Sequence, residues 1–156
     1  MSDADKYGQY ADRIAIFKGL TADEVAQVIK QGQTLHFRQN QTIFHEGMLG
    51  SNLFIVLGGE VGIYRKTELI ARCKTGDAFG EMAVLNHRPR TATATALSEA
   101  KCLTLDERQV NQILARGVST KLLLNIIAML SKRLENANAW ISEAIRKNKL
   151  EGGFPE

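Results

Sequence analysis

The hydrophobic spacing of the chain changes twice, and this change limits the possible folds more than any other feature. Apolar residues follow helical spacing from Tyr10 to about Gln33 and again from Asp106 to about Lys149. Between these zones, short apolar runs alternate with glycine turns, which is typical of a small antiparallel sandwich or barrel. The 156 residues suffice for one such domain. We place it at residues 10–149 and expect flexible tails at 1–9 and 150–156.

Turn and capping residues divide the chain further. Thr21, which is followed by two acidic residues, predicts the start of a helix that ends at Gly32. Turns are expected at Gly47, Gly50, Gly58-Gly59 and Gly76-Asp77. The strands predicted between these turns are Thr34–Arg38, Thr42–His45, Asn52–Leu57, Glu60–Lys66, Leu69–Lys74, Thr91–Leu97 and Lys101–Leu105.

Composition excludes several classes of protein. The net charge of +3 is small and the basic residues are scattered, which argues against a nucleic-acid partner. The chain starts with polar and acidic residues, so we expect no secretory signal. The longest apolar stretch, Leu122 to Leu130, contains Asn125 and is too short to cross a membrane. Cys73 and Cys102 lie far apart in the sequence, as reduced thiols of a cytoplasmic protein would.

Threonine and alanine alternate strictly between residues 91 and 96. Since side chains alternate between the two faces of a strand, one face carries hydroxyl groups and the other only methyl groups. Alanines that face inward leave space inside a small barrel. Close packing of a neighbouring strand or helix explains the same pattern.

The segment from Gly76 to Ala92 carries the strongest indication of a ligand. A glycine turn leads into a short helical segment, Glu81–Leu85, whose first backbone N–H groups lack intrahelical partners and suit an anion. Pro89 then fixes the start of the next predicted strand and places Arg90 at its first position. The planar guanidinium of arginine can bind two oxygens of a phosphate.

Glu81 narrows the choice of ligand. A carboxylate repels a phosphate, so its presence favours a ligand that brings a hydroxyl donor close to its phosphate, such as a ribose 2′-OH beside a cyclised phosphate. Polyphosphates are disfavoured because no GxxxxGK[ST] loop is present. Two simpler alternatives remain: Glu81 as a helix N-terminal carboxylate, and Arg90 as a surface residue.

Residues 79–85 and 89–92 resemble the phosphate-binding cassette of the cyclic-nucleotide-binding domains of catabolite activator proteins, of the regulatory subunits of cyclic-AMP-dependent kinase, and of cyclic-nucleotide-gated channels. Glu46-Gly47, residues 59–61 and residues 16–20 resemble further positions of this family, over about residues 12–148 in all. The resemblance implies an α+β fold: an antiparallel β-roll (a double-stranded, jelly-roll-like β-helix) flanked by N-terminal helices and a long C-terminal helix.

The resemblance also implies roles for individual residues. Glu81 would accept the ribose 2′-OH, and Arg90 would pair with the cyclic phosphate. Cyclic AMP or cyclic GMP would be the ligand, with no metal, and we favour cyclic AMP because the chain is short. The implied ligand-binding set is Gly80, Glu81, Met82, Ala83, Arg90, Thr91 and Ala92.

The nucleotide base requires an apolar surface. The strands before the cassette offer Ile63, Ala71 and Cys73, although ordinary core packing explains these residues equally well. In the C-terminal helix, the resemblance places the segment 135–138 over the base. A hydrogen bond would then come from Asn136 or Asn138, and Trp140 would stack on the base or pack in a dimer or on the barrel.

Two apolar stripes run along the C-terminal helix. Leu122, Ile126 and Met129 form one of them. The other advances in alternating steps of four and three residues, which is typical of a coiled-coil seam. It predicts a parallel homodimer through residues 123–144, unless the helix folds wholly onto its own barrel. This seam consists of Leu123, Ile127, Leu130, Leu134, Ala137, Ile141 and Ala144.

We find no catalytic constellation, and only a short segment follows the helix, so no helix-turn-helix domain is expected. The sequence therefore predicts a regulatory sensor for signal transduction that is not an enzyme and that reports through dimer geometry or an effector protein. An alternative is an interaction protein that has lost its ligand. A cupin-like metalloenzyme is disfavoured because His36, His45 and His87 are isolated. An iron–sulfur sensor would need more than two cysteines.

Overall fold

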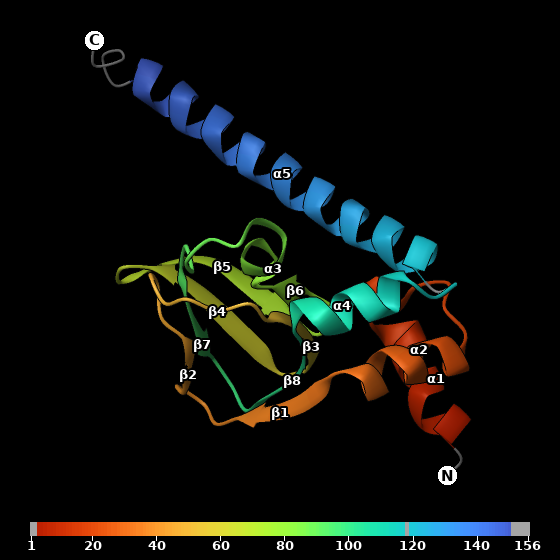
Figure 1. The fold of residues 1–156 in the computed structure, drawn as a ribbon. Helices are drawn as coiled ribbons and strands as arrows, with labels where there is room; N and C mark the ends of the chain where they lie inside the picture. The colour runs from red at the N-terminus through yellow and green to blue at the C-terminus, as the bar shows by residue number, and fades with distance from the viewer. Residues whose placement is uncertain (1–2, 118, 151–156) are drawn as a thin grey trace.

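Two antiparallel sheets form the centre of the chain, with helices at one end and a long helix above them (Figure 1). The computed structural model describes residues 3–117 and 119–150. The first sheet has the strand order β1-β8-β3-β6 and the second has the order β2-β7-β4-β5. The strands are β1 (Gln33–Phe37), β2 (Thr42–Phe44), β3 (Leu53–Gly58), β4 (Glu60–Arg65), β5 (Glu68–Lys74), β6 (Ala78–Phe79), β7 (Thr93–Ala96) and β8 (Ala100–Leu105).

Long-range pairing closes the strands into the expected β-roll. β8 lies between β1 and β3, and β7 pairs with both β2 and β4, in each case antiparallel. Two differences from the predicted strands matter for the site. The two-residue strand β6, which pairs with β3, was not predicted. β7 begins at Thr93 and not at Thr91, so Arg90 does not lie on a strand.

Two hydrophobic clusters make up the core. The first joins the N-terminal helices to the roll through Phe17, Val25 and Leu105, among others. The second fills the roll and includes Phe54, Phe79 and the alanines of β7. Ala92, Ala94 and Ala96 are 8%, 0% and 0% exposed, whereas Thr93 and Thr95 are half-buried. The predicted alternation in this segment is therefore confirmed, with the methyl face turned inward.

The N-terminal region is helical from Asp3, so the expected flexible tail over residues 1–9 was wrong for the described residues 3–9. α1 (Asp3–Arg13) buries Tyr7, which is 7% exposed, and Tyr10 and Ala11 pack on the same cluster. These three residues lie three and four positions apart and so form an apolar stripe on one helix face, too short to stand out in the sequence. η1 (Ala15–Phe17) and α2 (Ala22–Gln31) follow.

The capping residues of α2 are confirmed. The Glu24 backbone N–H donates to the Thr21 hydroxyl at 3.2 Å, and the Thr21 N–H donates to the Glu24 carboxylate at 2.8 Å. This reciprocal pair is a capping box. Gly32 is the C-cap. The bond from the Thr21 N–H lowers the pKa of Glu24, and Lys121 acts in the same direction.

The last helical zone contains two helices, α4 (Glu107–Leu114) and α5 (Ser119–Leu150). Leu122 at the start of α5 is buried, and the Asn125 side chain donates to the carbonyls of Ile16 and Lys18, both at 2.8 Å. α5 then runs past the roll and away from it (Figure 1). The expected tail 150–156 lies outside the described residues except for Leu150, which ends α5.

None of the helices in the described part of the chain is long and apolar enough to cross a membrane.

Candidate functional site

Gly80 sets the geometry of the cassette. It is the N-cap of α3 (Glu81–Asn86) and has φ +79°, in the left-handed region that favours glycine. A Cβ atom on Gly80 would lie 2.7 Å from Nη1 of Arg90 and 3.0 Å from the Asn52 carbonyl oxygen. Glycine is therefore required here both for the turn and for the close approach of the Arg90 side chain.

Arg90 is buried and firmly held. Its side chain is 7% exposed, Nη1 donates to the Gly80 carbonyl at 3.1 Å, and Nη2 donates to the Asn52 carbonyl at 2.9 Å. The guanidinium carbon also lies 4.1 Å from the ring centre of Phe44, within the range of a cation–π contact. These contacts contradict the alternative of a plain surface residue.

The charge of Arg90 is not neutralised by these partners, because both acceptors are neutral carbonyl oxygens. Burial lowers the pKa of Arg90, while the nearby Glu81 carboxylate raises it. An arginine remains protonated even so. Since a buried charge is costly unless it is paired, the arrangement favours an anion beside this guanidinium.

Glu81 lies in the first turn of α3 with its side chain 20% exposed. Its Oε1 is 3.8 Å from Nη1 of Arg133, a residue of α5 that sequence reasoning missed. Nη2 of Arg133 donates to the Ala78 carbonyl and lies 3.8 Å from the Cys73 sulfur. The sequence contains a pattern that places Arg133 on the inner face of α5. The spacing of four and three residues that joins Leu122, Ile126 and Met129 continues to position 133.

The three residues predicted under the base come together on one face of the second sheet. Ile63 and Ala71 are register partners on β4 and β5, and Cys73, two residues after Ala71, faces the same side. Ile63 is half-buried, Ala71 is exposed and Cys73 is 3% exposed. Burial raises the pKa of the Cys73 thiol to about 11, partly opposed by Arg133. Burial also raises the pKa of Cys102, to about 12.

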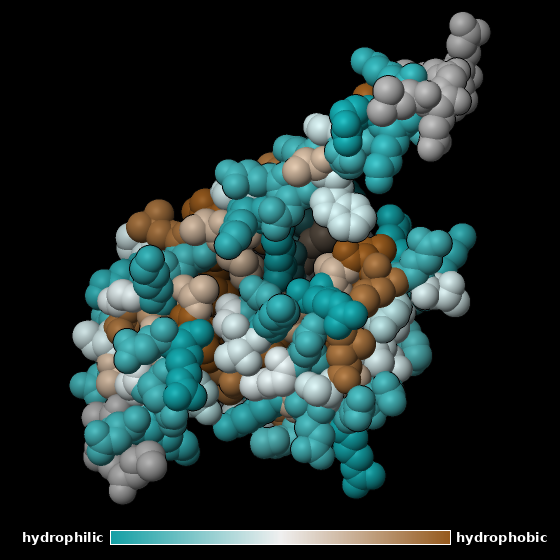
Figure 2. Space-filling model, turned by 180° about the vertical axis from the view of Figure 1, so that it is seen from behind, coloured by the Kyte–Doolittle hydropathy of each residue, from teal (hydrophilic) through white to brown (hydrophobic). Residues whose placement is uncertain are grey.

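The remaining predicted residues occupy different settings. Met82 and Thr91 are exposed and Ala92 is buried, whereas Ala83 belongs to α3 but its side chain lies outside the described residues. Asn136, Asn138 and Trp140 are exposed on the outer part of α5. By helical spacing, residues 136 and 140 share the face of Arg133, and Asn138 does not. Beneath the outer part of α5, hydrophobic atoms gather on the body (Figure 2).

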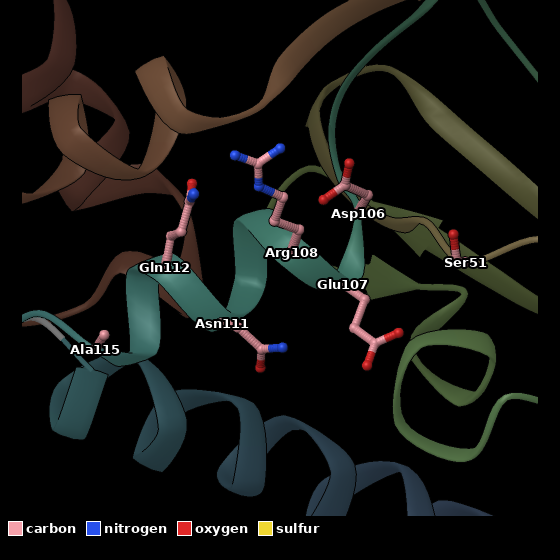
Figure 3. Close-up of a pocket in the computed structure, with 7 residues that line it drawn as sticks. All are labelled: Ser51, Asp106, Glu107, Arg108, Asn111, Gln112 and Ala115. Carbon is pink, nitrogen blue, oxygen red and sulfur yellow. The ribbon is translucent and has the colours of Figure 1, made fainter.

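A separate hollow of about 610 Å³ lies at the start of α4 (Figure 3). Its two acidic side chains already have partners: Asp106 accepts from the Gln109 N–H at 2.7 Å, and Glu107 lies 3.6 Å from Nδ1 of His87. None of the predicted site residues lines this hollow, so the cassette remains the candidate site. The lining residues are Ser51, Asp106, Glu107, Arg108, Asn111, Gln112 and Ala115.

Among the residues that the structure describes, no group of three or more histidine, cysteine, aspartate or glutamate side chains is placed to hold a metal ion.

Comparison with curated proteins finds relatives that are regulators. The chain is 30% identical over 130 residues to a CRP-like cAMP-activated global transcriptional regulator of Mycobacterium tuberculosis, covering 80% of this chain and 58% of the relative. It is 31% identical over 108 residues to a cAMP-dependent protein kinase regulatory subunit of Hypocrea atroviridis, covering 69% of this chain and 23% of the relative. The chain thus spans less than two thirds of these relatives.

Solved structures share the fold. The catabolite activator protein of Thermus thermophilus has a TM-score of 0.73 at 27% identity, over 83% of this chain and 62% of that one. A cyclic nucleotide-binding domain from Methylobacillus flagellatus has a TM-score of 0.77 at 23% identity, over 98% and 88% of the two chains. The family model described as "Cyclic nucleotide-binding domain" matches residues 34–117 of this chain. That match takes in more than half of the 156 residues, including the whole cassette, and the chain belongs to the family of cyclic nucleotide-binding domains.

Proposed function

We propose that this chain is a cyclic-nucleotide sensor that binds its ligand at residues 80–92 and performs no chemistry on it. The observation that carries this proposal is the Arg90 guanidinium, which is 7% exposed and donates hydrogen bonds to the neutral carbonyl oxygens of Gly80 and Asn52. A cyclic phosphate carries a single negative charge, which matches this group. The Glu81 carboxylate nearby is the acceptor for the ribose 2′-OH.

The base rests on the face formed by Ile63, Ala71 and Cys73. Asn136 and Trp140 approach it from the α5 face that also carries Arg133. Cyclic AMP is the favoured ligand over cyclic GMP, because the regulators that resemble this chain are named as cAMP-activated or cAMP-dependent. Thr91 is compatible with both nucleotides.

The sensor works as a homodimer through residues 123–144. The stripe of Leu122, Ile126 and Met129 packs on the body of the chain, whereas Leu134 and Ile141 of the other stripe are 61% and 57% exposed. A second copy of the seam supplies the missing partner surface. Binding of the nucleotide shifts α5, and with it the dimer geometry, which an effector protein in the cytoplasm reads.

Calorimetric titration of the wild type with cyclic AMP, cyclic GMP and 5′-AMP tests this function. We expect a dissociation constant of roughly micromolar for cyclic AMP, about −8 kcal/mol. Cyclic GMP should bind more weakly. 5′-AMP is the matched control, since its open phosphate brings a second charge that a single guanidinium does not offset. If neither cyclic nucleotide binds at millimolar concentration, the chain is not a sensor of this kind.

A further inference from the structure

Arg133 links α5 to the cassette, and one turn before it the Met129 sulfur accepts from the Ala78 N–H at 3.4 Å. From a helix whose outer part is exposed, Arg133 reaches the Glu81 carboxylate at 3.8 Å, the Ala78 carbonyl and the Cys73 sulfur. Its side chain is 35% exposed. These three partners belong to β5, β6 and α3, the elements that surround the candidate site.

The charges around the site explain why an arginine is needed at this position. Arg90 and Glu81 together are neutral, so a phosphate bound to them alone would leave one negative charge in excess. Arg133 supplies a second positive charge directly against Glu81. In a partly buried site such charges interact more strongly than in water.

We propose that Arg133 is a positioning residue of the nucleotide site, which offsets the charge of Glu81 and thereby couples anion binding to the docking of α5 on the cassette. This assignment rests on the proposed function. In this proposal Arg133 acts through Glu81 and does not contact the ligand itself. Because coupling between two equilibria is reciprocal, whatever factor the docked helix adds to ligand affinity, the ligand adds to helix docking.

Trp140 provides a reporter for the docking of α5. It is the single tryptophan of the chain, and it is 80% exposed. It lies seven residues after Arg133, two turns along the same helix face. Arg133 already contacts the cassette while Trp140 is exposed, so a closer approach of the outer half of α5 to an occupied cassette should shield Trp140 from a neutral quencher such as acrylamide.

The experiment compares the wild type, Arg133→Ala, Arg133→Lys and the control Lys132→Ala, which removes the same charge from an exposed position on a different face of α5. Cyclic AMP is titrated calorimetrically, and acrylamide quenching of Trp140 is measured with and without saturating ligand. We expect Arg133→Ala to bind about tenfold more weakly. Arg133→Lys should recover part of this loss, and Lys132→Ala should match the wild type.

Quenching separates coupling from a local effect on the site. Ligand should shield Trp140 in the wild type but not in Arg133→Ala, even at saturation. Equal affinity and equal shielding in both proteins would overturn the inference and leave the proposed function intact. Weaker binding with full shielding in Arg133→Ala would overturn the coupling. Failure of the wild type to bind any cyclic nucleotide would overturn the proposed function instead. Circular dichroism checks that the variants are folded. If Arg133→Ala does not fold, Arg133→Lys is compared with the wild type instead.

Discussion

The cassette and the outer half of α5 are opposite kinds of structure. In the cassette, Arg90 is 7% exposed and is bonded to two backbone carbonyls and stacked on Phe44. On the outer half of α5, Leu134 and Trp140 are 61% and 80% exposed. The proposed phosphate end of the site is thus formed by the chain's own fold, whereas the surface proposed to report occupancy has no cover within the described residues.

This difference assigns the two regions different tasks. A preformed phosphate site contributes affinity without the cost of ordering its groups on binding. A helix that is packed on the body over its first half, up to Arg133, leaves its outer half free to take more than one position, and a ligand shifts the balance when it contacts those positions differently. Binding and reporting are therefore separable, and substitutions should affect one without the other.

The largest effect is expected for substitutions in the exposed seam of α5. Replacing Leu130 and Leu134 by glutamate should convert the proposed dimer to a monomer, because like charges would then face each other across an apolar seam. Light scattering measures the mass directly. Ala128→Glu with Lys132→Glu is the matched control, with two charges at the same spacing on the exposed far side of α5. A monomeric wild type would contradict the seam.

In the cassette, Arg90→Ala should weaken nucleotide binding by about 3–5 kcal/mol, some hundredfold or more, because the bound phosphate would lose its charged partner. The loss should be similar for cyclic AMP and its 2′-deoxy analogue. Calorimetry measures both, with the exposed Arg88→Ala as control. Since Arg90 is buried, thermal unfolding must confirm that the variant is native. Binding that survives in a folded Arg90→Ala protein would place the ligand elsewhere.

A smaller and more selective effect is expected for Glu81. Glu81→Ala should cost about 1.5–3 kcal/mol with cyclic AMP, the range for a hydrogen bond to a charged group. With 2′-deoxy cyclic AMP the cost should be small, because that analogue lacks the hydroxyl. The wild type should therefore prefer the ribo form and Glu81→Ala should lose this preference. An equal loss for both ligands would mean that the carboxylate shapes the turn instead.

The smallest effect is expected on the stability of the fold, at the N-terminal cap of α2. Thr21→Ala should lower the free energy of unfolding by about 1 kcal/mol through loss of the helix cap. Thr21→Ala keeps the backbone N–H that lowers the pKa of Glu24, so the contribution of that carboxylate is tested by Glu24→Gln. Because the pKa of Glu24 is lowered in the folded state, this contribution is present at neutral pH and is lost as the pH falls through that lowered value. Urea unfolding at neutral and acid pH measures it, with the exposed Thr67→Ala as control. A cost of Glu24→Gln that is independent of pH would exclude a contribution from the charge of the Glu24 carboxylate.

Most of the secondary structure could be predicted from short sequence patterns. The capping box of α2 and the alternation before Leu97 follow from residue types at fixed spacing, and the structure confirms both. α1 and β6 were missed because their local signals are weak: a short apolar stripe near the start of the chain, and two residues within a glycine-rich turn. Their stability comes from tertiary contacts, which spacing alone does not reveal.

The site could be predicted from the sequence only where its residues lie close together in the chain. Gly80, Glu81 and Arg90 belong to one short segment, and their spacing carried the resemblance. Arg133 is separated from Glu81 by the whole of β7, β8 and α4, and no local pattern joins them. Extending the stripe of Leu122 and Met129 by one turn would have shown which face of α5 Arg133 occupies, but not what it meets there.

Hydrogen exchange with and without saturating cyclic AMP tests the location of the site most directly. We predict that ligand slows exchange of the backbone amides in residues 79–92, where the cassette encloses the phosphate, and in α5 around Arg133 and Trp140. Residues 106–115, which line the hollow at the start of α4, should serve as the internal reference and change little. Protection confined to residues 106–115, with the cassette unchanged, would contradict the assignment of the ligand to Arg90 and Glu81.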